Sequence, residues 1–265
     1  MKLHMIDVSV IGCGNMGSAL IKGLSRVDGY TVTAYDVAPE ALEAIEAHCE
    51  RTTTDIEDVH DSAVVVLAVK PEIVPLVLEE LDLDTDRTLV TFAAGVSTDV
   101  VAPQTDATVV RVMPNLAAET RNMAAAVSWD EPDENVARML SDLGEYVEID
   151  EDLMDVATAL NGSSPAFVFY LLGALQKRAV DEGLDEDDAE ILAAQTFKGA
   201  AETVLQSEKE IDELIDAVCS PNGTTIEGMN VLWDSDVEDV VGDALSAARR
   251  RSAELAEEAE KDAER

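Results

Sequence analysis

The sequence is poor in aromatic residues and in basic residues, and each shortage excludes something. Phe, Trp and Tyr make up 4% of the 265 residues whereas 47% are hydrophobic, so a core must be built mainly from aliphatic side chains. Lys and Arg number 18 against 56 Asp and Glu, which gives a formal net charge of −38. Nucleic acids and anionic membranes would be repelled by such a chain, and we expect neither as a partner.

The acid excess also bears on the solution in which the protein works. At about 1 M salt the Debye length is roughly 3 Å, so that like charges on the surface hardly repel one another. We therefore expect a protein adapted to concentrated salt. The alternative is an unusually acidic soluble protein without that adaptation.

Cysteine and histidine are too few and too scattered for a metal site or a disulfide framework. Three of each occur, far apart or without ligand spacing: Cys13, Cys49, Cys219, His4, His48 and His60. The longest apolar run, 165–175, is shorter than the about 20 residues of a membrane span. With no targeting segment recognised, these absences predict a cytoplasmic protein without a metal.

The first half of the chain alternates short apolar runs with helical stretches. Residues 63–69 form a continuous run of mostly β-branched residues, which is typical of a parallel strand buried on both faces. Further strands are predicted at 8–11, 31–35, 88–92, 108–112, 123–128 and 146–149, and helices at 15–25, 39–47, from 71, and at 133–143. This alternation of strands and helices predicts a Rossmann-type, doubly wound α/β sheet in residues 1–150.

The second half, residues 151–265, contains no strand signal and is predicted to be all-α. Helices are expected over 152–159, 165–182, 185–205, 210–218 and 236–264. The helix from Pro165 is apolar on nearly every side, with Phe167, Phe169, Tyr170 and Leu171 in succession. Such a helix must be covered on every side, and residues 151–265 provide few other helices that could cover it. We therefore expect a second subunit to cover it.

A glycine turn directly follows the first predicted strand and opens a helix. Gly12, Gly14 and Gly17 fit G-x-G-x-x-G, in which the glycines permit a tight turn, close approach of a pyrophosphate and close helix packing. The N–H groups of Asn15 and Met16 then lie at the helix end that attracts phosphate. The turn predicts a dinucleotide site; the alternative is that the glycines serve packing alone.

Asp36 ends the second predicted strand, roughly 20 residues past the turn, where an acid accepts the ribose hydroxyls of NADH. A carboxylate there would repel the 2′-phosphate of NADPH. We therefore expect NADH or NADPH as cofactor, with NADH favoured. The alternative is a solvated surface acid.

Five further segments, taken in their order along the chain, carry a family resemblance. They are Ala-Val-Lys-Pro at 68–71, Ala-Ala-Gly-Val-Ser at 93–97, Val-Arg-Val-Met-Pro-Asn at 110–115, Asn-Gly-Ser-Ser-Pro-Ala-Phe at 161–167 and Ser-Pro-Asn-Gly-Thr-Thr at 220–225. In this order they resemble the pyrroline-5-carboxylate reductases, which catalyse the last step of proline synthesis, and the resemblance covers essentially the whole chain. It implies a Rossmann domain, then a helical domain that intertwines with its twofold mate. A homodimer follows, with a larger assembly of dimers left open, and with each site between one chain's nucleotide domain and the other chain's helices.

The resemblance also implies roles for individual residues. Thr225 resembles the threonine whose hydroxyl reaches the substrate ring nitrogen, and the backbone of the turn around it would hold the substrate carboxylate. That turn supplies Ser220, Asn222, Gly223, Thr224 and Thr225 as substrate-binding residues. Ala68, Val69, Lys70 and Asn115 are placed beside the cofactor. Lys70 is also a catalytic candidate, although it could simply begin the helix before Pro71. Glu208 matches a glutamate of the family without a clear role.

Three residues depart from the family pattern. Asn222 stands where glycine is usual, and asparagine tolerates positive φ. Phe167 replaces a tyrosine, which removes a hydroxyl. Asp36 differs from the small or basic residues suited to NADPH.

The predicted reaction transfers a hydride from the nicotinamide to the C=N carbon of 1-pyrroline-5-carboxylate and gives L-proline. The source of the proton for the nitrogen is left open, and Arg111 is expected to brace strand ends. A β-hydroxyacid dehydrogenase is one alternative, but it would need a lysine early in the helix after Pro165, and the first there is Lys177. A non-catalytic nucleotide sensor of the same fold is the other.

Overall fold

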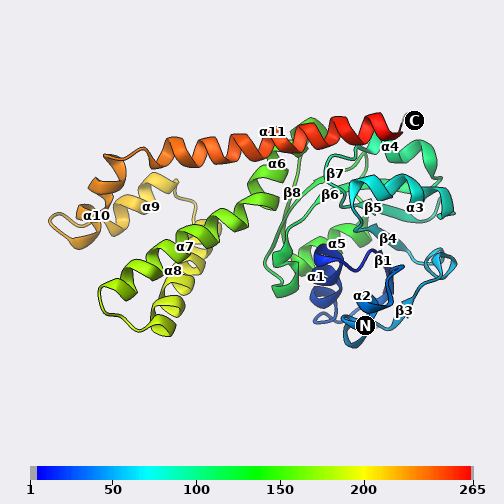
Figure 1. Cartoon of the computed structure of the whole chain (residues 1–265), viewed down its shortest axis with the longest axis horizontal. Coiled ribbons are helices and arrows are strands. Elements are labelled where there is room, and N and C mark those ends of the chain that lie inside the picture. Colours follow the sequence, from blue (N-terminus) through cyan, green and yellow to red (C-terminus); the bar gives the residue numbers. More distant parts are fainter. Residues whose placement is uncertain (1–4, 264–265) are drawn as a thin grey trace. The chain divides into compact units, whose positions relative to one another are not determined.

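The structure, a computed structural model, describes residues 5–263 (Figure 1). Two compact units divide the chain. One comprises Met1–Ser163 together with Ala247–Arg265, as far as these are described, and the other comprises Ser164–Ser246. We call them the sheet unit and the helical unit. No helix in the described range is long and apolar enough to cross a bilayer.

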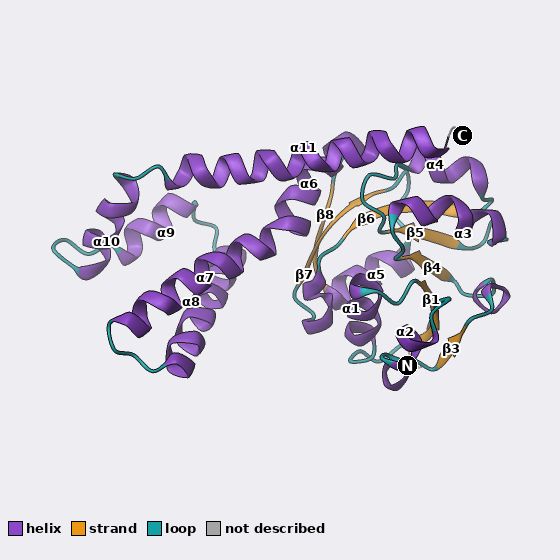
Figure 2. Cartoon of the chain, in the orientation of Figure 1, coloured by secondary structure: helices purple, strands orange, loops and turns teal. Residues whose placement is uncertain are grey.

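The sheet unit is built on eight strands in the order β3-β2-β1-β4-β5-β6-β7-β8 (Figure 2). Their bounds are β1 Ile6–Ile11, β2 Tyr30–Tyr35, β3 Arg51–Thr53, β4 Val64–Leu67, β5 Thr88–Thr91, β6 Thr108–Met113, β7 Met123–Ser128 and β8 Gly144–Glu148. The strands from β3 to β6 are parallel, β7 runs antiparallel to β6, and β8 is parallel to β7. The doubly wound Rossmann-type sheet is therefore confirmed, with two reversed strands added at one edge.

Both faces of the sheet are covered, which explains the uninterrupted β-branched run in β4. Val64 and Val66 pack in the core with α1 (Asn15–Leu24) and α5 (Glu134–Leu143). Val65 and Leu67 point to the other face and pack with α3 (Val74–Glu80) and α4 (Thr98–Val101). Because side chains alternate along a strand, a strand buried on both sides must be apolar at every position.

Several elements are shorter than the sequence predicts. The helix expected over 39–47 is α2 (Pro39–Glu43) followed by a 3₁₀ turn at Glu46–His48. The stretch after Pro71 is a 3₁₀ turn, Pro71–Ile73, before α3 begins. Other 3₁₀ turns lie at Ile56–Val59, Ala102–Gln104, Leu116–Thr120 and Glu151–Leu153. The helix expected over 152–159 is α6 (Met154–Ala157), which continues as a π-helical turn at Thr158–Ser163.

The helical unit holds α7 (Ser164–Asp181), α8 (Glu186–Gln206), α9 (Ile211–Val218) and α10 (Thr224–Trp233). The last of these was not predicted, because Asn222 and Gly223 mark a turn. In α7 none of the residues is buried within the chain, and Phe169 and Tyr170 are 71% and 79% exposed. One chain therefore leaves several large apolar side chains of α7 exposed.

The long helix α11 (Val237–Ala263) begins in the helical unit and ends in the sheet unit. In the sheet unit, the Ser252 hydroxyl lies 2.7 Å from the Asp155 carboxylate. Gly95, at φ +78°, has no room for a Cβ, which would lie 2.8 Å from the backbone nitrogen of Ala256. These contacts, and the packing of Met154 with Met113, explain why the compact units do not follow the expected boundaries of 1–150 and 151–265.

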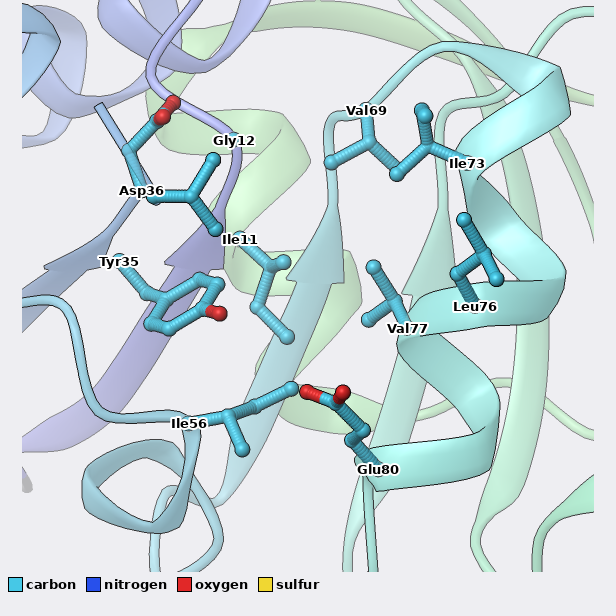
Figure 3. Close-up of a pocket in the computed structure, with 11 residues that line it drawn as sticks. Ile11, Gly12, Tyr35, Asp36, Ile56, Val69, Ile73, Leu76, Val77 and Glu80 are labelled. Carbon is cyan, nitrogen blue, oxygen red and sulfur yellow. The ribbon is translucent and has the colours of Figure 1, made fainter.

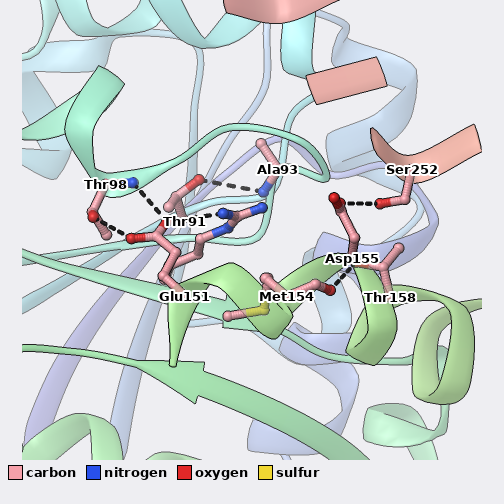
Figure 4. A network of polar contacts seen from close by, with 9 residues as sticks. Thr91, Ala93, Thr98, Glu151, Met154, Asp155, Thr158 and Ser252 are labelled. Carbon is pink, nitrogen blue, oxygen red and sulfur yellow. Dashed lines mark hydrogen bonds and ion pairs between the residues drawn. The ribbon is translucent and has the colours of Figure 1, made fainter. Parts of the chain in front are cut away.

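Glu151 joins the start of the segment after β8 to the sheet (Figure 4). Its carboxylate accepts hydrogen bonds from the Thr98 backbone N–H at 2.9 Å, from the Thr98 hydroxyl, and from buried Arg111 at 2.8 Å. Burial alone raises the pKa of the Glu151 carboxyl, but the bonds from Thr98 and Arg111 outweigh it and hold the pKa below its ordinary value. Arg111 thus braces the end of β6.

Glu151→Gln is expected to lower the free energy of unfolding by about 1–3 kcal/mol at neutral pH, because buried Arg111 loses its charged partner. The folded-state pKa of Glu151 is depressed, so the stabilisation is complete above the unfolded value near 4.5 and is lost as the pH falls through the folded value. Urea denaturation from about pH 7 to about pH 3 measures this difference. The exposed acid next in sequence gives the control variant Asp152→Asn. A difference that persists unchanged at the lowest pH would contradict the account.

Candidate dinucleotide and substrate sites

The glycine turn lies between β1 and α1, and two of its glycines have no space for a side chain. Gly12 has φ +97°, and a Cβ there would lie 2.9 Å from the carbonyl oxygen of Ala68. A Cβ on Gly17 would lie 1.9 Å from the carbonyl oxygen of Gly12. Gly14 differs, since no atom lies within 4 Å of its Cβ position. Two glycines thus permit packing, and the third leaves open space in front of the turn.

The first turn of α1 is open to an anion. Its N-cap is Gly14, which offers no side chain, and no side chain caps the helix. The first N–H groups of a helix have no partner within the helix, so those at Asn15 and Met16 can bind phosphate oxygens. Ser18 stabilises the turn, because its hydroxyl donates a hydrogen bond to the Cys13 carbonyl at 2.8 Å. These residues fit the pyrophosphate of a dinucleotide, as the spacing of the glycines predicts.

Asp36 follows β2 and is tied to the glycine turn. One carboxylate oxygen accepts the Cys13 backbone N–H at 2.7 Å, and the other accepts the Ala38 N–H at 2.9 Å. The carboxylate is therefore held in one orientation beside Gly12. Each oxygen of an ionised carboxylate can accept more than one hydrogen bond, so both retain capacity for a ribose hydroxyl.

A cavity of about 230 Å³ opens beside Asp36, between the ends of β1 and β2 and the helix α3 (Figure 3). It lies where the strand order reverses, between β1 and its neighbours, which is the usual place for a ligand in an open α/β sheet. Its lining comprises Ile11, Gly12, Tyr35, Asp36, Val37, Ile56, Val69, Ile73, Leu76, Val77 and Glu80. Val37 and Leu76 remain 78% and 58% exposed, which leaves apolar surface for a ligand to cover.

The sequence predicts three of the residues that line this cavity, Gly12, Asp36 and Val69, but not the wall formed by α3. Ile73, Leu76, Val77 and Glu80 are spaced at three, four and seven positions, so they share one face of a helix. That spacing, directly after Val69, was the available signal. From the sequence we predict only that a helix begins at Pro71, without considering which residues share a face of it.

Cys13 sits within the glycine turn but is a packing residue. Its thiol is buried and donates to the Tyr35 carbonyl at 3.6 Å. Burial, with additions from the Asp36 carboxylate and from Cys49, raises the pKa of the Cys13 thiol to about 12. The thiol therefore stays protonated at neutral pH and is a poor nucleophile.

Two of the expected cofactor residues have different surroundings. The Asn115 amide is engaged within the protein: its oxygen accepts from the N–H groups of Ala117 and Ala124, and its nitrogen donates to the Asn161 carbonyl at 3.2 Å. Lys70 is exposed after β4 at the N-cap of the 3₁₀ turn, and in the described part of the chain its ammonium group has no hydrogen bond or ion pair. Lys70 is thus free for a ligand, whereas Asn115 links β6, β7 and the π-helical turn.

In the helical unit, the turn 220–225 leads into the first residues of α10. Asn222 has φ +60°, the left-handed conformation that glycine or asparagine adopts most readily. A Cβ at Gly223 would lie 2.3 Å from the Ser220 hydroxyl oxygen, which can rotate away, and 3.0 Å from the Ser220 carbonyl oxygen, so the turn leaves little room there. Thr224 and Thr225 are the first two residues of α10, whose N-terminus has no side-chain cap. Their N–H groups are therefore placed to hold a carboxylate.

Among the described residues, no group of three or more His, Cys, Asp or Glu side chains is arranged as metal ligands would be.

Comparison with known proteins identifies relatives that match nearly the whole chain. Residues 151–255 match the family described as pyrroline-5-carboxylate reductase dimerisation, and residues 7–95 match NADP oxidoreductase, coenzyme F420-dependent. The pyrroline-5-carboxylate reductase of Methanosarcina acetivorans is 36% identical, over 94% of this chain and 97% of that protein.

Solved structures agree with this comparison. A pyrroline-5-carboxylate reductase from Coxiella burnetii superimposes with a TM-score of 0.84 at 31% identity, over 95% of this chain and 99% of the other. The Plasmodium falciparum pyrroline carboxylate reductase with NADP bound gives 0.84 at 24% identity, over 96% and 100%, and so supports the fold. On the identity and the coverage of these matches, the chain belongs to the pyrroline-5-carboxylate reductase family.

Proposed function

We propose that this protein reduces 1-pyrroline-5-carboxylate to L-proline with a nicotinamide dinucleotide. The observation that carries the proposal is the similarity over nearly the whole chain to pyrroline-5-carboxylate reductases, at up to 36% identity among those compared. The open glycine turn and the uncapped start of α10 provide places for a dinucleotide and a small carboxylate.

Each group of residues has a distinct task in the proposed reaction. The bound dinucleotide supplies the hydride. The turn at Gly12, Gly14 and Gly17 holds the pyrophosphate, and Val69 follows the strand that passes beside the nicotinamide. The first N–H groups of α10 hold the substrate carboxylate. The Thr225 hydroxyl orients the ring nitrogen, which must end protonated, with the proton arriving on the substrate or through water. Holding the reactants in line and excluding water is the main protein contribution.

A β-hydroxyacid dehydrogenase is the less favoured function. Such an enzyme needs a lysine near the start of the helix that follows residue 163. In α7 the first two turns are apolar or small, and Lys177 lies in the last third of the helix. A non-catalytic sensor would have no need of the Thr224–Thr225 turn that this chain retains.

The protein is proposed to act as a homodimer whose helical units intertwine, so that the turn 220–225 of one chain serves the sheet unit of its partner. The supporting observation is the exposed apolar surface of α7 and α8, including Phe169, Tyr170 and Ile191. Light scattering is expected to give twice the chain mass, or a multiple of this dimer mass where dimers assemble further. A monomer that is active when dilute would sink this proposal.

Adaptation to concentrated salt in the cytoplasm is proposed on the net charge of −38. Turnover and stability should both rise as KCl is increased from about 0.1 M toward molar concentrations, because salt screens the repulsion among the acids. Activity that declines steadily over the same range would argue against it.

Thr225→Ala should lower kcat about ten- to a hundredfold, because one hydrogen bond to the reacting nitrogen is lost. The Kd for NADH should not change. The measurement is NADH oxidation with 1-pyrroline-5-carboxylate, with proline quantified as product. Thr225→Ser is the matched control and should recover most of the rate. If Thr225→Ala is as active as the wild type while Thr224→Ala is inactive, the wrong threonine has been assigned.

NADH should be used at least as well as NADPH, because the fixed Asp36 carboxylate repels a 2′-phosphate and none of the residues lining the cavity is Lys or Arg. Salt screens this repulsion, so the preference should narrow as KCl rises. Asp36→Ser is expected to move the ratio of kcat/KM toward NADPH. A wild-type protein that strongly prefers NADPH at every salt concentration would show that Asp36 does not face the ribose.

A further inference from the structure

The cavity beside Asp36 has two polar ends and an apolar middle (Figure 3). Val37 lies after β2, Ile73 lies just before α3 and Leu76 lies on α3, so apolar side chains line the cavity from both sides. A flat ring with apolar faces and hydrogen-bonding edges suits such a space. With Asp36 and the glycine turn at one end, the middle of the cavity is placed to take a purine attached to the ribose.

Glu80 forms the other end of the cavity. It is the last residue of α3, it shares a helix face with Ile73 and Leu76, and Figure 3 shows its carboxylate near Ile56. In the described residues neither a hydrogen bond nor an ion pair engages this carboxylate. Tyr35 and Glu80 line the same cavity. Burial, followed by the charges of Glu80, Asp36 and Asp55, raises the pKa of the Tyr35 phenol.

We propose that Glu80 is a specificity residue that accepts a hydrogen bond from the exocyclic amino group of the adenine ring. This rests on the proposed function, in which the cavity holds the adenosine half of the dinucleotide. An ionised carboxylate can only accept hydrogen bonds. An amino group on the purine donates to it, whereas a keto oxygen in the same position faces it with lone pairs and is repelled. The site therefore selects 6-amino over 6-oxo purines.

The matching probes are NADH and its deaminated analogue, in which hypoxanthine replaces adenine. Hydrogen bonds to charged groups are stronger than hydrogen bonds between neutral groups, but the exposure of Glu80 to solvent weakens this one. We expect the wild type to bind NADH about tenfold more tightly than the analogue. Glu80→Gln should bring the two Kd values within about twofold of each other, because an amide can donate as well as accept.

The Kd values are measured by isothermal titration calorimetry without substrate, so the test does not depend on turnover. Glu79→Gln removes the same charge from the neighbouring residue, which does not line the cavity, and should keep the wild-type ratio. Leu76→Trp fills the cavity and should weaken both ligands.

The possible failures are distinguishable. Two results would overturn the role of Glu80: a wild type that binds both ligands equally well, or a Glu80→Gln variant that keeps the full preference for NADH. If Leu76→Trp weakens the binding of both ligands, the cavity remains the adenosine site. Unchanged NADH binding by Leu76→Trp overturns the placement of the cofactor itself. Failure to form proline, with the Glu80-dependent preference intact, would contradict the proposed function and leave this inference standing.

Discussion

The contact between the backbones of Gly12 and Gly17 is the constraint on which the rest of the sheet unit depends. A single added carbon on Gly17 would lie 1.9 Å from the Gly12 carbonyl oxygen, so α1 can approach β1 this closely only because Gly17 lacks a side chain. This approach sets where the first turn of α1 points. It also brings the Cys13 N–H to the Asp36 carboxylate, which joins the turn to the end of β2. The cavity opens from that junction, and its walls on β2 and α3 follow from it.

Glycine, charge and apolar surface have separate tasks in this arrangement. The uncapped helix ends at α1 and α10 provide N–H groups for anions, in a chain whose many acids would otherwise repel them. Asp36 and Glu80 are the two acids that line the cavity. Asp36 is held beside the glycine turn by the Cys13 N–H, and Glu80 lies at the other end of the cavity, on α3. The apolar lining between them supplies contact area without adding charge. An acidic protein can in this way retain a site for an anionic dinucleotide.

Much of this arrangement could be predicted from local patterns. The β-branched run at β4 and the spacing of Gly12, Gly14 and Gly17 are short-range signals whose physical causes, burial on both faces and close backbone packing, leave few alternatives. The elements that were missed depend on distant contacts. Strand β3 has only three residues and pairs through its backbone with β2. The reversal of β7 and the return of α11 to Gly95 and Asp155 have no local pattern that could have indicated them. Asn222 suggested a turn and concealed α10; its φ of +60° is a conformation that asparagine tolerates.

The central claim is that a hydride passes from the nicotinamide to the imine carbon of a cyclic imino acid. Transfer of deuterium tests it most directly. The protein would be incubated with 1-pyrroline-5-carboxylate and NADH that carries deuterium on the reactive face of C4, and the product examined by mass spectrometry and NMR. The account predicts L-proline with one deuterium, located on the δ-carbon of the ring, at a rate that matches NADH oxidation. Proline without deuterium, or deuterium delivered instead to a 3-oxo acid substrate, would contradict it.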